Sequence, residues 1–274
     1  MRNTLTAHRT ADWTRQGTTF AKSVRAFYFT LVMVLASAFP VRAQLGAYPV
    51  TMSFDPGASA TRVLTVLSEA TEPMQVKLYL GDFEQHAEGG HDWGPLGAHP
   101  MSCDGRITIF PEAVELDPAT TAQVRVTMEP GSETCWSAVF VERVVPEAAY
   151  RVAHRIAIKV HGHPDVAVTK ANVVAVEVGL AEVGLEAVIT IDNIGNTNLQ
   201  PDGDLEIRSN MGDVVHSQEI PLFSVLPGHR RIVRVPLPTD LTEGSFLAIP
   251  IFDIGHDYLL GGQAPFQVTG RSER

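Results

Sequence analysis

The chain has 274 residues, of which 45% are hydrophobic and 19% are charged, so its composition is that of a globular protein long enough for two domains. It carries 31 acidic residues against 21 basic ones, a formal net charge of −10 at pH 7. This acidic excess argues against nucleic acid and anionic membrane surfaces as partners.

The first 43 residues have the pattern of a secretory signal peptide. Basic residues lead into an apolar run from Ala26 to Phe39, and we predict cleavage between Ala43 and Gln44. An uncleaved anchor and a misplaced start codon are the alternatives, because the basic leader is long. The apolar run has about 14 residues, fewer than the roughly 20 that span a bilayer, so we expect no stable membrane insertion after cleavage. Cleavage removes 6 of the 21 basic residues and 1 of the 31 acidic ones, which leaves a net charge of −15.

The first half of the mature chain shows short strand signals separated by Gly, Pro, Asp and Asn, a pattern typical of all-β proteins. The clearest signal alternates apolar with polar residues from Met74 to Leu80, which predicts a strand with one buried face. The strands expected here are 50–54, 62–67, 74–80, 106–110, 123–128, 136–144 and 150–160. Seven strands are the number of a simple immunoglobulin-like sandwich.

Residues 81–105 are glycine-rich and show no periodicity, so we expect a long polar loop there. This loop carries imidazoles and carboxylates that can bind a divalent metal, but their spacing matches no familiar ligand set. The residues in question are His86, Glu88, His91, Asp92 and His99. We interpret them as a solvated loop, and we interpret the acidic residues Asp192, Asp202 and Asp204 as ordinary turns and not as a calcium site. The sequence therefore predicts no metal and no cofactor.

The segment from His161 to Asp165 breaks the strand pattern and is the predicted domain boundary, with both of its histidines solvent-exposed. The strands expected beyond it are 173–178, 186–192, 204–208, 214–219, 231–235, 245–252 and 258–268. No amphipathic helix of useful length is present. We therefore predict an all-β protein with two tandem immunoglobulin-like β-sandwich domains, 44–162 and 163–274, after a signal peptide at 1–43.

A short repeat supports the tandem arrangement. Pro118 and Arg125 recur as Pro227 and Arg234, each pair seven residues apart, and an aromatic-led apolar strand follows both copies. Each arginine stands between valines, so we expect it on the solvent-facing side of its strand.

Cys103 and Cys135 are the only cysteines of the chain. An even number in an exported protein indicates a disulfide, and both residues precede strands that begin at the same end of an up-and-down sandwich. Two free buried thiols are the alternative. The absence of a Cys-x-x-Cys pair argues against a redox site. Nucleophile elbows, phosphate loops and zinc-protease motifs are also absent, so we expect no catalytic residues and no enzyme.

Several motifs follow one another in the first half in a recognisable order. They are Phe54 to Thr61, Phe110 to Glu112, Val114 to Pro118, Gln123 to Val126, Cys135 to Arg143 and His154 to Val160. In this order the first half resembles the amino-terminal domain of PapD-like periplasmic chaperones, the pilus-assembly family. The second half, through Asp192 to Asn196 and Val225 to Gly228, is similar to the carboxy-terminal part of PapD-like secreted proteins.

The resemblance implies that the last strand of the first domain lends alternating apolar residues to an incomplete fibre subunit by β-strand addition. A basic pair on the first and last strands would hold the terminal carboxylate of that subunit by charge-assisted hydrogen bonds. By position, Arg155 matches the basic residue of the last strand, and Tyr150 and Val152 match donor residues. The matching position on the first strand is Thr51, which is neutral, so half of the basic pair is missing.

We therefore expect an exported, periplasmic protein that binds a protein client, as a chaperone for pilus- or fimbria-type fibre subunits with an outer-membrane usher as a further partner. The alternative is a structural or adhesive β-sandwich module of the cell envelope, secreted or at the cell surface, without chaperone activity. The neutral residue Thr51 favours this alternative.

Overall fold

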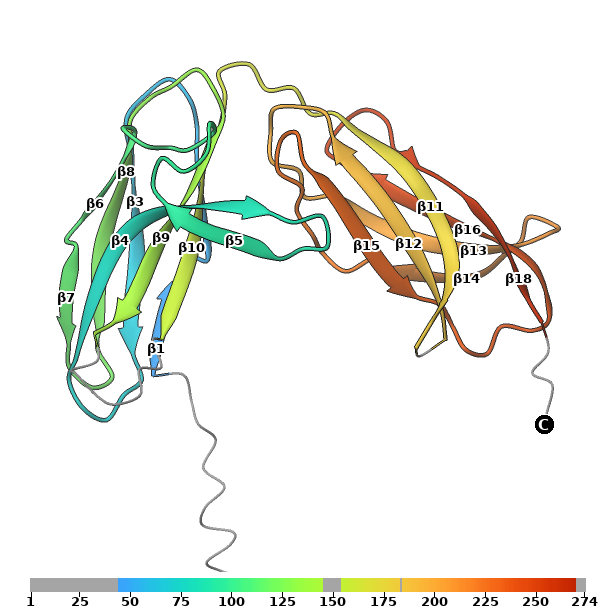
Figure 1. Ribbon diagram of the computed structural model, residues 1–274, viewed down its shortest axis with the longest axis horizontal. Coiled ribbons are helices and arrows are strands. Elements are labelled where there is room, and N and C mark those ends of the chain that lie inside the picture. The colour runs from blue at the N-terminus through green and yellow to red at the C-terminus, as the bar shows by residue number, and fades with distance from the viewer. Residues whose placement is uncertain (1–43, 145–153, 183, 270–274) are drawn as a thin grey trace, which may run out of the picture. The chain divides into compact units, whose positions relative to one another are not determined.

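The computed structural model describes residues 44–144, 154–182 and 184–269, and every regular element in these ranges is a β-strand (Figure 1). The all-β prediction is confirmed, and the strands form four sheets arranged as two sandwiches. None of the described segments forms a helix long and apolar enough to cross a membrane. The predicted signal peptide with Ala43, and the predicted donor residues Tyr150 and Val152, lie outside the described residues.

The first sandwich consists of a four-stranded and a six-stranded sheet. In sheet order, the four-stranded sheet contains β1 (Leu45–Tyr48), β3 (Ala60–Ser68), β8 (Thr121–Met128) and β6 (Ile107–Phe110). The other sheet contains β2 (Thr51–Phe54), β10 (Arg155–Gly162), β9 (Cys135–Arg143), β4 (Met74–Gln85) and β5 (His91–Pro95), with β7 (Ala113–Leu116) also paired to β4. The first strand is split, because β1 belongs to one sheet and β2 to the other.

Every second residue along each strand faces the core of this sandwich, as the alternating pattern predicts. Leu64 of β3, Val124 of β8 and Ile158 of β10 are fully buried in it. The disulfide between Cys103 and Cys135 is present at one end, with a separation of 32 residues and a Cα–Cα distance of 5.1 Å, which confirms that pairing.

The prediction of a long loop at 81–105 is wrong over its first part. β4 continues to Gln85 and forms an antiparallel hairpin with β5, from Gly81 opposite Pro95 to Gln85 opposite His91. The hairpin is stable because one of its faces is aromatic: the ring of Phe83 lies 5.7 Å from that of Trp93 across the two strands.

This aromatic face continues onto β9. From Cys135 to Val141 all seven residues of β9 are buried, so both faces of the strand are covered. Val139 and Val141 face the core, whereas Trp136 and Phe140 pack on the outer face with Phe83.

The second sandwich contains a three-stranded and a five-stranded sheet. The first consists of β11 (Ala171–Ala181), β12 (Gly184–Asn193) and β15 (Arg230–Pro236). The second consists of β14 (Val214–Glu219), β13 (Asp202–Ser209), β16 (Gly244–Asp253), β17 (Leu260–Gly261) and β18 (Ala264–Val268). The single strand expected at 258–268 is therefore two short strands, both paired with β16.

The chain passes from the first group of sheets to the second between Gly162, the last residue of β10, and Ala171. His161 is not part of an exposed linker, as the sequence suggested, but a buried residue of β10 that is 6% exposed. Its ring meets that of Phe83 edge-on at 6.0 Å. The strand continues two residues further than the histidine and proline content indicated, because β2 pairs with it there.

Candidate functional site

The last strand of the first sandwich, β10, has a free edge. It pairs with β9 along its whole length, from Arg155 opposite Glu142 to Gly162 opposite Cys135. On its other side it pairs with β2 in parallel, but only from Lys159 onward. Within the described residues, 155–158 therefore have no partner strand on that side. Unpaired N–H and C=O groups at such an edge can accept a further strand.

Lys159 lies at the point where this free edge ends. Its register partner on β2 is Thr51. The side chain extends over the outer face of the sheet, where its ammonium group lies 5.6 Å from the centre of the Phe83 ring. The structure thus places Lys159, and not Arg155, beside Thr51.

Lys159 and Thr51 line a cavity of about 290 Å³, which we call the cationic cavity. Other polar residues that line it are Gln85, His91, Gln200, Ser224 and Arg231. No carboxylate is among the described residues of its lining, although the chain as a whole is acidic. Two cations and an imidazole therefore line one cavity without an acidic side chain in its wall.

Three buried nitrogen atoms of this cavity's side chains have no hydrogen-bond partner among the described residues. They are Nε and Nη1 of Arg231 and Nε2 of His91. Leaving a buried donor unpaired costs about 1–3 kcal/mol, and more for a charged group. An acceptor that entered the cavity would remove this cost.

The charges in the cavity act on one another. Burial, and then the positive charges of Lys159, Arg231 and His86, lower the pKa of His91 to about 4. Burial and then the charge of Arg231 lower the pKa of Lys159. Burial also lowers the pKa of Arg231, with Glu88 acting in the opposite direction. All three groups would therefore be stabilised in their protonated forms by an added negative charge.

The tip of the β4–β5 hairpin holds Arg231 in place. The backbone N–H of Ile232 donates to the carbonyl of Ala87 at the tip, at 2.8 Å. Gly89 lies against the guanidinium group, and a Cβ at this position would clash with Nη1 of Arg231. Its φ of +103° is a second reason for glycine at this position.

Gln85 fixes the adjacent wall of the cavity. Its Nε2 donates to the carbonyl of Ser224 at 2.9 Å, and its Oε1 accepts from the backbone N–H of Leu226 at 3.0 Å. Leu226 is 1% exposed and packs against Phe83 and Trp136. The amide group and the buried leucine together hold this loop of the second sandwich against the hairpin.

Arg155 lies at the start of β10, on the same face as Lys159 but four residues away, roughly 13 Å along a strand. Its guanidinium carbon lies 4.7 Å from the centre of the Phe140 ring, and its Nη1 donates to the hydroxyl of Tyr79 at 3.5 Å. The side chain is exposed and the structure does not bring it to Thr51. Its part in binding stays a prediction.

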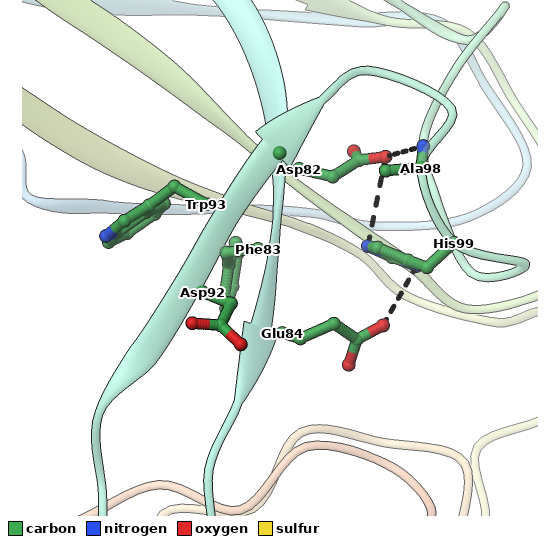
Figure 2. Close-up of a pocket in the computed structure, with 8 residues that line it drawn as sticks. Asp82, Phe83, Glu84, Asp92, Trp93, Ala98 and His99 are labelled. Atoms are coloured by element: carbon green, nitrogen blue, oxygen red, sulfur yellow. Dashed lines mark hydrogen bonds and ion pairs between the residues drawn. The ribbon is translucent and has the colours of Figure 1, made fainter.

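A second cavity, of about 210 Å³, lies between the hairpin and the loop that follows it (Figure 2). Asp82 is 1% exposed there and accepts hydrogen bonds from the backbone N–H of Ala98 at 2.9 Å and the hydroxyl of Ser137 at 2.7 Å. His99 faces Asp82 and Glu84, with its Nε2 4.0 Å from Asp82 and its Nδ1 3.8 Å from Glu84 (Figure 2). These contacts tie the loop to the hairpin.

The residues weighed as metal ligands are divided between the two cavities. His91 lines the cationic cavity, whereas Asp92 and His99 line the second one. Nε2 of His86 lies 3.1 Å from Asp92, and Glu88 lies near an arginine of β15. Within the described ranges, no group of three His, Cys, Asp or Glu side chains is placed to hold a metal ion.

The residues weighed as calcium ligands are separated as well. Asp192 forms a two-point pair with Arg230, at 2.7 and 2.8 Å, and this pair lowers the pKa of the carboxyl group. Asp202 and Asp204 lie exposed on β13.

No family model matches this chain, and no curated protein matches it. Solved structures of fimbrial chaperones are similar to it. The class 5 fimbriae chaperone CfaA has a TM-score of 0.47 at 15% identity, over 83% of this chain and 100% of the other. A chain of the CsuC–CsuE pre-assembly complex from the Csu pili of Acinetobacter baumannii has a TM-score of 0.45 at 9% identity, with 82% and 98% covered. The E. coli chaperone DraB has a TM-score of 0.42 at 18% identity, with 82% and 97% covered.

Proposed function

We propose that this protein is a periplasmic chaperone that binds a subunit of a surface fibre by accepting an extended segment of that subunit along β10. The observation that carries this proposal is the free edge at 155–158, which ends at Lys159 and the cationic cavity. A strand added at this edge would extend the six-stranded sheet, and its main chain would supply most of the affinity. The motifs shared with PapD-like chaperones support the same role.

Lys159 is the residue that we expect to hold the terminal carboxylate of the client. The family resemblance requires a basic pair, with one residue on the last strand and one on the first. Lys159 lies on the last strand, directly opposite Thr51 of the first. It also lies at the end of the free edge, where a strand paired with β10 would reach the cavity. An outer-membrane usher is a further partner in this proposal, and catalysis has no part in it.

Site-specific photocrosslinking in the native periplasm tests the proposal. A photoreactive residue at Ala157, on the free edge, should capture a secreted β-rich subunit, whereas the same residue at Gln123, exposed on the other sheet, should not. Lys159→Gln should lower the yield at Ala157 at least tenfold, because a charge-assisted hydrogen bond contributes about 1.5–3 kcal/mol. Arg155→Gln is the matched control on the same strand and should lower the yield less.

Equal crosslinking at Ala157 and Gln123 would contradict strand addition. Equal loss in the Lys159→Gln and Arg155→Gln variants would contradict the assignment of the carboxylate to Lys159. Recovery of the protein in stoichiometric amounts within the mature surface fibre would favour the structural module instead, since a chaperone is left behind in the periplasm.

A further inference from the structure

The cationic cavity contains an arginine for which neither the sequence motifs nor the proposed function has a use. We propose that Arg231, on β15 of the second sandwich, is the second cation of an anion site that Lys159 and His91 complete, and that this site takes a carboxylate. The proposal rests on the proposed function in one respect only, namely that the carboxylate is the end of a bound strand.

Arg231 differs from the other arginines of its strand. Arg230 pairs with Asp192 at two points, and Arg234 lies 3.0 Å from Glu186. Arg231 has no ion pair among the described residues, and two of its buried N–H groups have no acceptor there. A buried guanidinium group with unpaired N–H groups is a strong donor for the oxygens of a carboxylate.

The position of Arg231 also explains how a site with a neutral residue at Thr51 can hold an anion. Thr51 lies directly opposite Lys159 on β2 and supplies only a hydroxyl group. Arg231 lines the same cavity from β15, so the second positive charge comes from the other sandwich. Since no described carboxylate lines the cavity, neither cation is neutralised by a side chain of its wall.

His91 is the third member because it lines the cavity with an unpaired buried Nε2. Its ring lies 5.5 Å from each of Phe83 and Trp93, and the charged groups that act on it are Lys159 of β10, Arg231 of β15 and His86 of the hairpin tip. Two acidic groups act at the border of this set: the charge of Glu88 acts on Arg231, and Asp92 lies 3.1 Å from Nε2 of His86.

A bound carboxylate would offset the positive charges around His91, so the imidazole would take up a proton more readily in the complex than in the free protein. By linkage, binding must then strengthen as the pH falls from 7 toward 5. The binding constant cannot change by more than tenfold for each pH unit, because only one proton is taken up on binding.

The anion site is tested first without any client, with sodium sulfate as the probe and the ring protons of His91 followed by NMR. Saturating sulfate should raise the pKa of His91 measurably, and Arg231→Gln should weaken sulfate binding at least tenfold. Arg230→Gln is the matched control, because it removes the same charge from the adjacent position, and it should change binding less than threefold. A pKa of His91 that does not respond to sulfate, or equal effects of the two variants, would overturn the proposal.

Peptides then identify the ligand. A labelled decapeptide of alternating Val and Thr is compared with its carboxy-terminal amide by fluorescence polarisation at pH 7 and pH 5. The free acid should bind at least tenfold more tightly than the amide, with a larger ratio at pH 5, and His91→Gln should remove the pH dependence of the ratio. Equal binding of acid and amide would overturn the assignment to a terminal carboxylate. Binding of sulfate but of neither peptide would contradict strand addition while supporting the anion site.

A second variant covers the case in which Arg231→Gln disturbs the contact between β15 and the hairpin. Thr51→Arg introduces a cation opposite Lys159, on the β2 wall of the same cavity. In the Arg231→Gln background it should restore at least part of the lost sulfate affinity if charge is what Arg231 contributes. A folded double variant that stays as weak as Arg231→Gln would contradict that role.

Discussion

Replacing His161 with phenylalanine should remove much of the pH dependence of folding between pH 7 and pH 5. Burial, and then the charges of Lys159 and His163, lower the pKa of His161 from 6.5 to about 4. Because the folded-state pKa lies below the unfolded-state value, the unfolded chain binds the proton more readily. The protein therefore loses stability as the pH falls from 6.5 toward 4, and above 6.5 this group contributes nothing to the pH dependence.

The magnitude follows from the size of the shift. Each pH unit below 6.5 costs about 1.4 kcal/mol of unfolding free energy until the folded state also takes up the proton. At pH 5 the loss from His161 is about 2 kcal/mol, and near pH 4 it approaches about 3 kcal/mol. His161 is 6% exposed, so solvent screening reduces this value little.

Urea unfolding followed by tryptophan fluorescence at pH 7, 6 and 5 measures the effect. Between pH 7 and pH 5 the wild type should lose about 2 kcal/mol more than His161→Phe, because other titrating groups contribute equally to both and cancel. His256→Gln, at an exposed histidine, should follow the wild type. Equal losses in the wild type and His161→Phe would contradict the lowered pKa of His161.

Two further predictions concern the packing that supports the site. Leu226→Ala should cost about 2–5 kcal/mol of unfolding free energy, because Leu226 is 1% exposed, whereas Leu222→Ala, at a residue that is 78% exposed, should change it by less than about 0.5 kcal/mol. Similar values for the two in urea unfolding would contradict the packing role of Leu226. Replacing both Cys103 and Cys135 with alanine should cost about 3–4 kcal/mol, because the disulfide closes a loop with a separation of 32 residues. Calorimetric melting that is unchanged by the replacement would contradict this value.

Most strands could be predicted from the sequence because each alternates between a buried and an exposed face. Strand β8, for example, exposes Gln123 and Arg125 and buries Val124 and Val126, and it ends at Met128 as predicted. The hairpin at 81–95 could not be predicted in this way. Both sides of its first strand are covered, one by Phe83 and its aromatic neighbours and the other by the hydrogen bonds of Asp82, so no alternation of polar and apolar residues marks it.

The basic residue of the site could be predicted as to its strand but not as to its position. Arg155 and Lys159 have the same parity on β10 and face the same side of the sheet, so the residue pattern alone does not separate them. What separates them is the register of a parallel pair, which sets Thr51 opposite Lys159. The register depends on where the chain crosses from β1 to β2, between Tyr48 and Thr51, and the alternation of residues on β10 does not contain that information.

The place of Arg231 in the site could not be predicted either, because it depends on contacts between segments that are far apart in the sequence. The unpredicted hairpin at 81–95 makes those contacts. At the tip of the hairpin, the carbonyl of Ala87 accepts a hydrogen bond from the backbone N–H of Ile232, and Gly89 lies against the guanidinium group of Arg231. The hairpin also contributes His91 to the cavity. If residues 81–105 were a loop, no element would join β15 to β10, and only half of a basic pair would be visible in the pattern of residues. With the hairpin in place, two cations line one cavity of a chain that is acidic as a whole. Because Leu226 packs against the hairpin, the affinity of this cavity for an anion must depend on the packing of Leu226 as well as on the two charges.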